Sequence, residues 1–245
     1  MNKADHSHDP DDIAARLQMK PTVNYLRDWI YGGIDGAVTT FAVVAGVVGA
    51  ELDTGVVLIL GFANLAADGF SMAASNYSGT KADLDDYARL KQIELRHIRR
   101  HPEGEREELR QIYARKGFAG EELERVVDLL SRHEDVLLET MMAEEYGLTA
   151  VQRSPLLAAL ATFLAFIVCG AIPLLPFVLG FGASALYATV VTGVVFFFIG
   201  TVKSRWSTQS WYASGLETFI IGMAAAGLAY AVGAALRGLA GGVGL

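Results

Sequence analysis

Long apolar stretches alternate with one strongly charged segment along this 245-residue chain. A helix needs about 20 mostly apolar residues to cross the hydrocarbon core of a bilayer. Five stretches meet that requirement, at residues 28–50, 55–78, 155–180, 184–202 and 212–236. The pattern therefore predicts an all-α membrane protein with five transmembrane helices.

The predicted spans divide the chain into four parts. Residues 1–27 form a polar N-terminal tail, and residues 28–79 hold the first two spans. Residues 80–150 form a charged helical domain, and residues 151–245 hold the last three spans. Two prolines in the third span, Pro173 and Pro176, remove backbone donors and are expected to kink or end that helix.

Composition supports a membrane protein and excludes other classes. Hydrophobic residues make up 52% of the chain and the mean hydropathy is +0.34, which is unusual for a soluble enzyme. The net charge is −7 and the basic residues are interleaved with acids, so no nucleic-acid partner is expected. The chain has no phosphate-binding loop and no nucleophile-and-base constellation, so we predict that it is not an enzyme.

The basic residues outside the charged domain predict the orientation. The connection at residues 51–54 has no Lys or Arg, whereas the N-terminal tail and the fourth connection do. The positive-inside rule then places the N-terminus and the charged domain in the cytosol, and an odd number of spans places the C-terminus on the other side. The basic residues concerned are Lys3, Arg16, Lys20, Arg27, Lys203 and Arg205.

The charged domain is predicted to contain three helices. The first continues from the second span to about Arg100, the second covers about residues 104–115, and the third covers about residues 120–146. The sequences HPEG and KG separate them. In the third, apolar residues recur every three or four positions with a lapse at Glu134, so a small helical bundle is expected.

Acidic residues in this domain have a spacing that suits metal binding. Glu105 and Glu108 lie three residues apart, as do Glu94 and His97, so each pair projects from one helix face. In a helix this charged, the same spacing also arises by chance, with neighbouring arginines as partners. The spacing alone leaves both interpretations open.

The stretch LETMMAEEYG places two thioethers beside two carboxylates. Met141 and Met142 precede Glu144 and Glu145 directly. One interpretation is that the methionines fill a helix core while the acids face water. The other is a metal site, because late first-row divalent ions accept both donor types, whereas Mg²⁺ and Ca²⁺ prefer oxygen.

Polar residues also lie inside the predicted spans, where an ionisable group costs at least about 2.5–3.5 kcal/mol. Asp35 lies in the first span. Two interpretations are open: it is a cation or proton site, or it is an acid at the membrane interface. Asn64, Asp68, Met72 and Asn76 follow at intervals of four in the second span and form a polar stripe. Glu217 lies near the start of the fifth span and is interpreted either as an interfacial acid or as a proton-coupling group.

Small residues in the first span permit close helix packing. Gly32 and Gly36 form a G-x-x-x-G motif, which Ala42 and Gly46 continue. Such motifs let two helices approach closely, and here we expect them to favour a homodimer.

Three motifs together resemble the vacuolar iron transporter family, which includes yeast-type vacuolar iron and manganese transporters and bacterial relatives. They are DGAVTTFAVVAGVVGA in the first span, ANLAADGFSMAASNYSGTKAD after it, and MMAEEYGL before the third span. The resemblance covers nearly the whole chain. It implies a dimer of five-span protomers with a translocation path between them and a cytosolic three-helix metal-binding domain.

The resemblance also implies functions for individual residues. Asp35 and Met72 match the acid and the methionine that handle metal in the membrane, and the family activity is Fe²⁺/H⁺ antiport. The cytosolic ligands match Glu94, Glu105, Glu108, Met141, Met142 and Glu145. Two positions depart from the family: His97 stands where a glutamate is common, and Asn64 stands where some members have an acid. Both departures remove a negative charge, and the imidazole of His97 favours later, softer metals.

We therefore expect a transporter that exports Fe²⁺, or Mn²⁺, Co²⁺ or Zn²⁺, from the cytosol for detoxification or storage. Metal is its substrate, no permanent cofactor is expected, and its partners are metal ions, protons, the bilayer and a second copy. The membrane is a bacterial plasma membrane or a vacuolar membrane. Two alternatives are a membrane-tethered ferritin-like iron oxidase or store, because ELRH contains one Glu-x-x-His, and a metal-sensing interaction module on a membrane anchor.

Overall fold

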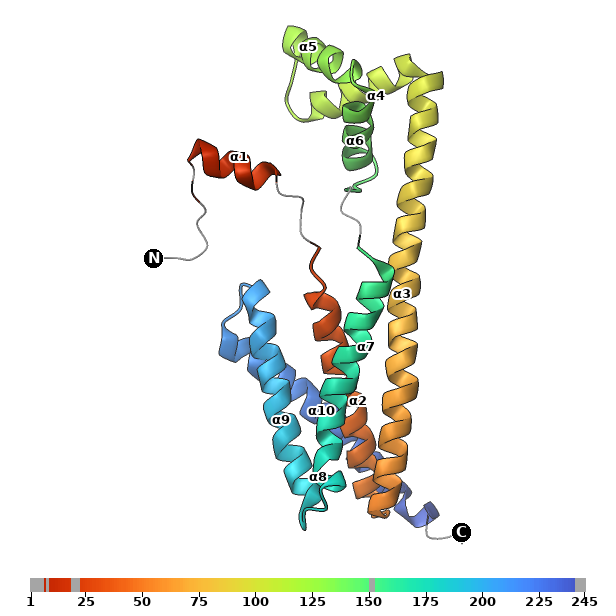
Figure 1. The fold of residues 1–245 in the computed structure, drawn as a ribbon, viewed down its shortest axis with the longest axis vertical. Coiled ribbons are helices and arrows are strands. Elements are labelled where there is room, and N and C mark those ends of the chain that lie inside the picture. The colour runs from red at the N-terminus through yellow and green to blue at the C-terminus, as the bar shows by residue number, and fades with distance from the viewer. Residues whose placement is uncertain (1–6, 8, 19–22, 150–152, 241–245) are drawn as a thin grey trace. The chain divides into compact units, whose positions relative to one another are not determined.

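The computed structural model describes residues 7, 9–18, 23–149 and 153–240, and this part of the chain forms helices and no strand (Figure 1). The longest helix, α3, continues for 47 residues without a break. The elements are α1 (Pro10–Gln18), α2 (Leu26–Gly49), α3 (Thr54–Arg100), α4 (Pro102–Arg115), α5 (Gly120–Ser131), α6 (Glu134–Glu144), α7 (Pro155–Ala171), η1 (Ile172–Leu174), α8 (Leu175–Val178), α9 (Ser184–Lys203), η2 (Ser204–Trp206) and α10 (Trp211–Ala240).

The chain divides into two compact units. The apolar unit comprises Tyr25–Asp83 and Ser154–Leu245, and the charged unit comprises Met1–Asn24 and Leu84–Arg153. Helix α3 begins in the apolar unit and ends in the charged unit, as the sequence pattern predicted for a helix that continues to about Arg100. Part of the predicted N-terminal tail lies outside the described residues.

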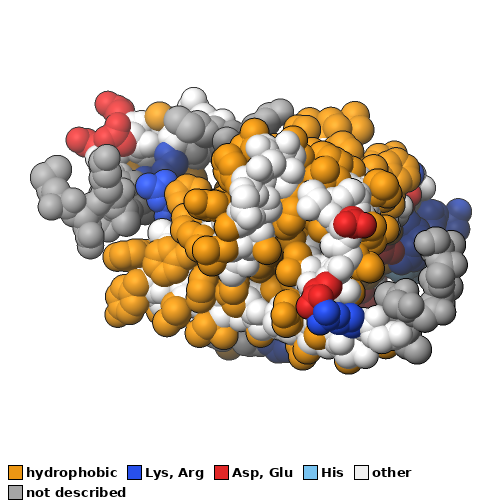
Figure 2. All heavy atoms as spheres, turned by 90° about the horizontal axis from the view of Figure 1, so that it is seen from below, with side chains coloured by type: hydrophobic (Ala, Val, Ile, Leu, Met, Phe, Trp, Pro, Cys, Tyr) orange, Lys and Arg blue, Asp and Glu red, His pale blue; other side chains and the backbone are white. Residues whose placement is uncertain are grey.

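Five helical segments are long and apolar enough to cross a membrane, which confirms the predicted number. Large hydrophobic side chains lie on their surfaces, among them Ile59, Phe70 and Leu228. Figure 2 shows hydrophobic side chains covering most of the face that it presents, with few charged groups between them. Such a surface is stable in contact with lipid and unstable in contact with water. The segments are Leu26–Gly49, Thr54–Arg100, Pro155–Val178, Ser184–Trp206 and Trp211–Gly238.

Helix α2 lies at the centre of the apolar unit. In the most apolar stretch of α2, 56% of the residues are buried, whereas in the most apolar stretch of α10 only 11% are buried. Helix α2 contacts α7, α9 and α10. The core around it contains Phe41, Val44, Phe166 and Phe196. Because α2 is surrounded on several sides, its small residues serve packing within one chain.

The glycine motif of the first span is one such packing feature, and its expected use was wrong. A Cβ atom added at Gly32 or Gly36 would collide with the backbone of Thr162 or Phe166 in α7. These glycines therefore let α7 approach α2 inside the chain, and Gly46 is likewise approached by Gly233 of α10. The motif consequently gives no support to a dimer.

The prolines of the third span end its regular helix, as predicted. Helix α7 stops at Ala171, a 3-10 turn covers Ile172–Leu174, and the short helix α8 follows. Proline lacks the backbone N–H that a continuing α-helix would need at these positions. Ser154 caps the other end of α7, where its hydroxyl accepts a hydrogen bond from the N–H of Leu157.

The charged unit contains the end of α3 together with α4, α5 and α6. Their shared core contains Ile98, Leu109, Val127 and Leu138. The expected single helix over residues 120–146 was wrong, because α5 ends at Ser131 and α6 begins at Glu134. His133 between them has an extended backbone, with φ −122° and ψ 100°. The break coincides with the lapse in the apolar pattern and lets each short helix turn its own apolar side inward.

Candidate metal centre and polar track

Three potential metal ligands meet in the charged unit. Glu94 and His97 lie three residues apart on α3, and Glu105 lies in the first turn of α4. Each offers one ligand atom, and these atoms all lie within 4.8 Å of one another. The turn at His101 and Pro102 brings the start of α4 back to the last turns of α3, which explains the convergence. We refer to these three residues as the acid cluster.

Two carboxylates of the acid cluster are buried to an unusual degree. The exposed fraction is 1% for Glu94 and 3% for Glu105, whereas the His97 side chain is 51% exposed. Among the described residues, Glu94 Oε1 and Glu105 Oε2 are buried and have no hydrogen-bond partner. Such oxygens are costly unless a proton or a cation satisfies them. The donor set of two carboxylates and an imidazole therefore fits a divalent transition metal.

The electrostatics agree with this geometry. Burial raises the pKa of Glu105 to about 8, helped by a hydrogen bond with Glu94 and by the charges of Glu94, Glu108 and Glu145. At neutral pH the carboxyl group of Glu105 thus stays protonated in the metal-free protein. The Nδ1 atom of His97 lies 3.7 Å from Oε1 of Glu105. A metal ion would replace the proton of Glu105 and offset the repulsion among the neighbouring acids.

The two neighbouring acids in the MMAEEYG motif have different electrostatic partners. Burial and the negative charge of Glu94 raise the pKa of Glu145, and Glu108 adds to this effect. Glu144 instead lies 2.5 Å from the Nζ atom of Lys116. The negative charge of Glu108 also raises the pKa of Glu105. Glu108 and Glu145 therefore lie in the field of the acid cluster, and Glu144 forms a partly exposed ion pair.

Both methionines of the motif lie in the core of the charged unit. The exposed fraction is 0% for Met141 and 2% for Met142, and both belong to the cluster that contains Leu109 and Ile112. The N–H of Glu145 donates a 2.9 Å hydrogen bond to the carbonyl of Met141, one helical turn earlier. Met141 and Glu145 thus lie on one side of α6.

Sequence reasoning missed one residue at the acid cluster. The hydroxyl of Tyr146 donates a 3.3 Å hydrogen bond to Oε2 of Glu94, which is 52 residues away in the chain. The available signal was its position directly after Glu145 in the motif. A tyrosine in a core normally directs its hydroxyl to a polar partner.

The apolar unit contains a row of polar side chains between α2 and α3. Asp35 of α2 interacts electrostatically with Asp68 of α3. One turn earlier on α3, the amide Nδ2 of Asn64 lies 3.3 Å from the hydroxyl oxygens of both Thr39 and Thr40. We refer to this row, together with Met72, as the polar track; Met72 is partly buried against the apolar core.

The polar stripe of α3 ends at a buried network that the sequence did not predict. Asn76 donates hydrogen bonds of 2.9 Å to Oδ1 of Asp28 and of 2.7 Å to Oγ1 of Thr162. Asp28 is 4% exposed. Because Asp28 precedes Asp35 by two helical turns, both acids lie on the side of α2 that α3 approaches. The network joins α2, α3 and α7.

Glu217 has a different environment. Its Oε1 lies 3.5 Å from Nζ of Lys203 at the end of α9, and its side chain is 44% exposed. This is a surface ion pair between two consecutive helices of the apolar unit.

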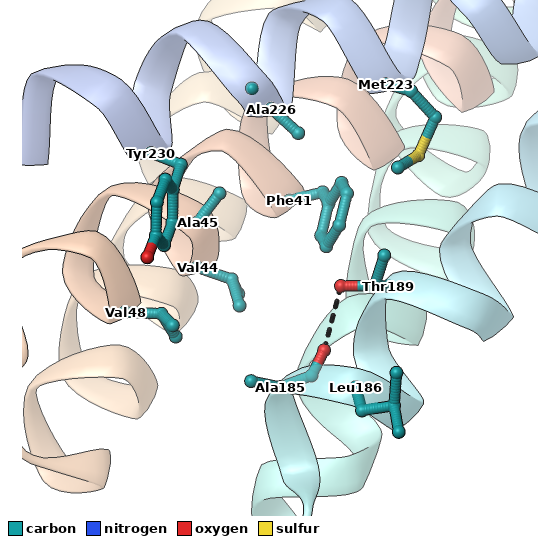
Figure 3. Close-up of a pocket in the computed structure, with 11 residues that line it drawn as sticks. Phe41, Val44, Ala45, Val48, Ala185, Leu186, Thr189, Met223, Ala226 and Tyr230 are labelled. Carbon is teal, nitrogen blue, oxygen red and sulfur yellow. Dashed lines mark hydrogen bonds between the residues drawn. The ribbon is translucent and has the colours of Figure 1, made fainter. Parts of the chain in front are cut away.

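A cavity of about 310 Å³ lies between α2, α9 and α10 (Figure 3). Its lining is apolar apart from Tyr230 and Thr189, and the hydroxyl of Thr189 donates to the carbonyl of Ala185 at 2.9 Å. It contains no ionisable acid or imidazole, so its chemistry does not suit a cation. The polar track lies on another side of α2.

Comparison with known proteins gives consistent relatives. The family model described as the VIT family matches residues 26–234. The protein named vacuolar iron transporter from Toxoplasma gondii (strain ATCC 50861 / VEG) is 34% identical over 226 residues, which is 87% of this chain and 75% of that protein. Vacuolar iron transporter 2 from Oryza sativa subsp. japonica is 35% identical over 217 residues, which is 87% of this chain and 88% of that protein. The Plasmodium berghei (strain Anka) vacuolar iron transporter is 30% identical over 95% of this chain and 89% of that protein.

Proposed function

The chain belongs to the vacuolar iron transporter (VIT) family, and we propose that it moves Fe²⁺ out of the cytosol in exchange for protons. Its relatives are named as transporters, and five segments of this chain can cross a membrane. The protein is accordingly a membrane transporter and not an enzyme.

The observation that carries the proposal is the pair of buried, unpartnered carboxylate oxygens on Glu94 and Glu105. Fe²⁺ supplies the positive charge that these oxygens lack. Glu108 and Glu145 add negative charge around the acid cluster. The thioethers of Met141 and Met142 would add preference for transition metals over Mg²⁺ and Ca²⁺. The imidazole of His97 also suits Mn²⁺, Co²⁺ and Zn²⁺, which we expect as further substrates.

Translocation is assigned to the polar track. Asp35 and Asp68 offer carboxylates, Asn64 offers an amide and Met72 offers a thioether, without an enclosing cage. Protonation of Asp35 would weaken its hold on the cation, which couples metal release to proton entry at one side chain. Glu217 is a second candidate for this coupling. Two protomers facing each other would complete the lining, so we propose a homodimer with the track at its interface.

We further propose that the N-terminus and the charged unit face the cytosol. The basic residues of the N-terminal tail and of the α9–α10 connection support this orientation. In a vacuolar membrane or a bacterial plasma membrane the same orientation removes metal from the cytosol. Storage or detoxification of iron follows in either case.

The test is uptake of Fe²⁺ by proteoliposomes that contain a pH-sensitive dye, with Mn²⁺ and Zn²⁺ assayed in parallel. Wild type is expected to take up Fe²⁺ while the interior becomes more alkaline. The variant Asp35→Ala is expected to lose uptake and to keep metal binding, which is measured separately on the detergent-solubilised protein.

Three results would contradict the proposal in different ways. Binding without flux in wild type would mean that the charged unit acts as a sensor or store. Flux of Fe²⁺ without a pH change would leave a transporter but remove the antiport. Oxygen consumption on addition of Fe²⁺ would indicate the ferroxidase alternative.

A further inference from the structure

The segment that follows α6 makes a specific turn. Gly147 has a φ of +68°, a left-handed conformation that other residues adopt only at a cost. The N–H of Leu148 donates a 2.9 Å hydrogen bond to the carbonyl of Met142. This turn folds the chain back against the end of α6. Tyr146 is held inside it, immediately before the left-handed residue.

The turn directs the Tyr146 hydroxyl to a single atom of the acid cluster. Tyr146 is partly buried against the core of the charged unit, so its ring has little freedom. Its hydroxyl donates to Oε2 of Glu94, while Oε1 of the same carboxylate is buried and unpartnered. The two oxygens of Glu94 therefore have different environments. One is fixed by the tyrosine, and the other is left for a ligand.

The same hydroxyl also acts on Glu145, the preceding residue, where it partly offsets the rise in the pKa of that carboxyl group. A phenol has one proton to donate, and here Glu94 accepts it, so the hydroxyl links the end of α6 to α3. Groups that hydrogen-bond to metal ligands without binding the metal orient those ligands and tune the metal affinity.

We propose that Tyr146 is a positioning residue for metal binding: its hydroxyl holds Oε2 of Glu94 so that Oε1 of Glu94 is presented to the metal. This inference rests on the proposed function of the acid cluster. It adds a residue that acts through the ligands and does not bind metal itself.

The experiment uses full-length protein in detergent and Mn²⁺ or Co²⁺ as the probe. Mn²⁺ affinity is measured from the electron paramagnetic resonance signal of free Mn²⁺, and the visible spectrum of bound Co²⁺ reports ligand geometry. Tyr146→Phe is expected to lower the Mn²⁺ affinity by about 10-fold, at the lower end of the range for outer-shell partners, and to change the Co²⁺ spectrum. Circular dichroism checks that the helices remain.

Tyr113→Phe is the matched control. Tyr113 is partly buried in the same core, but its ring packs edge-on against Phe118 with the centroids 5.7 Å apart. This variant is expected to bind both metals as wild type does.

A double-mutant cycle with Glu94→Gln identifies the route of the effect. If Tyr146 acts through Glu94, removing its hydroxyl has a clearly smaller effect in the Glu94→Gln background. An unchanged Mn²⁺ affinity and Co²⁺ spectrum in Tyr146→Phe would overturn the inference. An equally large loss of affinity from Tyr146→Phe in the Glu94→Gln protein would also overturn it. Absence of metal binding in wild type would instead refute the acid cluster as a metal centre, which keeps the two failures distinct.

Discussion

The charged unit and the apolar unit hold their carboxylates in different ways. In the charged unit, Glu94 and Glu105 are buried and each has an oxygen without a partner among the described residues, so the ligand group is assembled within one chain. In the apolar unit, Asp35 is half-buried and Asp68 is exposed, on two helices. The first arrangement is suited to capture a cation, and the second leaves one side of the track open.

This difference agrees with the separate tasks that we propose for the units. A preorganised, dehydrated cluster binds an ion tightly, because the cost of bringing like charges together has already been met by the fold. A transport path must also release the ion, so an open and partly hydrated lining is appropriate. The predictions below change one unit at a time, in order of decreasing expected effect.

The largest effect is expected when a buried ligand of the acid cluster is removed. Glu105→Ala should lower Mn²⁺ affinity by at least about 100-fold, more than the loss of an outer-shell group. The same variant should raise the melting temperature of the metal-free protein at pH 8, because a buried acid beside other acids has been removed. Affinity is measured by electron paramagnetic resonance, and melting by circular dichroism in the presence of a chelator.

Glu107→Ala is the control for this change. Glu107 lies on the same helix but is exposed, and it bonds to Arg110 and Gln111. Surface ion pairs of this kind contribute little. A loss of affinity in Glu107→Ala equal to that in Glu105→Ala would show that general charge, and not the cluster, binds the metal.

The next effect is a dependence of metal binding on pH. The pKa of Glu105 is raised from 4.5 to about 8, so its proton must leave when metal binds. Below pH 8, release of this one proton should make metal affinity rise by up to about tenfold for each pH unit. Above pH 8, Glu105 is already deprotonated and should add nothing further to the pH dependence. The acids that face Glu105 are Glu94, Glu108 and Glu145. In Glu105→Gln the slope should decrease by one proton; an unchanged slope would exclude Glu105 as its source.

The same shift has a consequence for stability with the opposite sign. Because the folded pKa of Glu105 lies above the unfolded value, the metal-free protein is stabilised by this group at low pH. That contribution is lost as the pH rises from about 4.5 through about 8. Metal should therefore raise the melting temperature more at pH 8 than at pH 6.

The sequence predicted the helices better than the contacts between them. Apolar runs and prolines are local signals, so five spans and the interruption at Pro173 could be predicted. The use of Gly32 and Gly36 could not, because the same spacing serves contacts within a chain or between chains. The spacing made Glu94, His97 and Glu105 candidate ligands and the family resemblance favoured the two glutamates, but the turn at His101 that brings the three together is a tertiary feature. Tyr146 was missed because its partner is distant in the chain.

A smaller effect is expected in the polar track. Asn64→Asp adds a negative charge where the hydroxyls of Thr39 and Thr40 already surround the amide. The hydroxyl of Thr39 already donates to the carbonyl of Asp35, but that of Thr40 can donate to the new carboxylate, so the fold should tolerate it. Flux of Fe²⁺ at low concentration should increase several-fold, while Mn²⁺ binding to the charged unit stays constant. Asn64→Ala is the control that removes the amide without adding charge, and flux should not increase in it.

The smallest effect is expected at Glu144, which adjoins Glu145 but has a different partner. Its carboxylate pairs with Lys116, and both side chains are partly exposed. Because screened surface pairs contribute about 0–1 kcal/mol, Glu144→Gln should change Mn²⁺ affinity by less than about twofold, whereas Glu145→Gln should lower it clearly. Both variants make the same chemical change one residue apart, so the pair separates position from charge. Equal losses in the two variants would mean that the motif attracts metal by its charge alone, and that the turn after α6 does not select one acid.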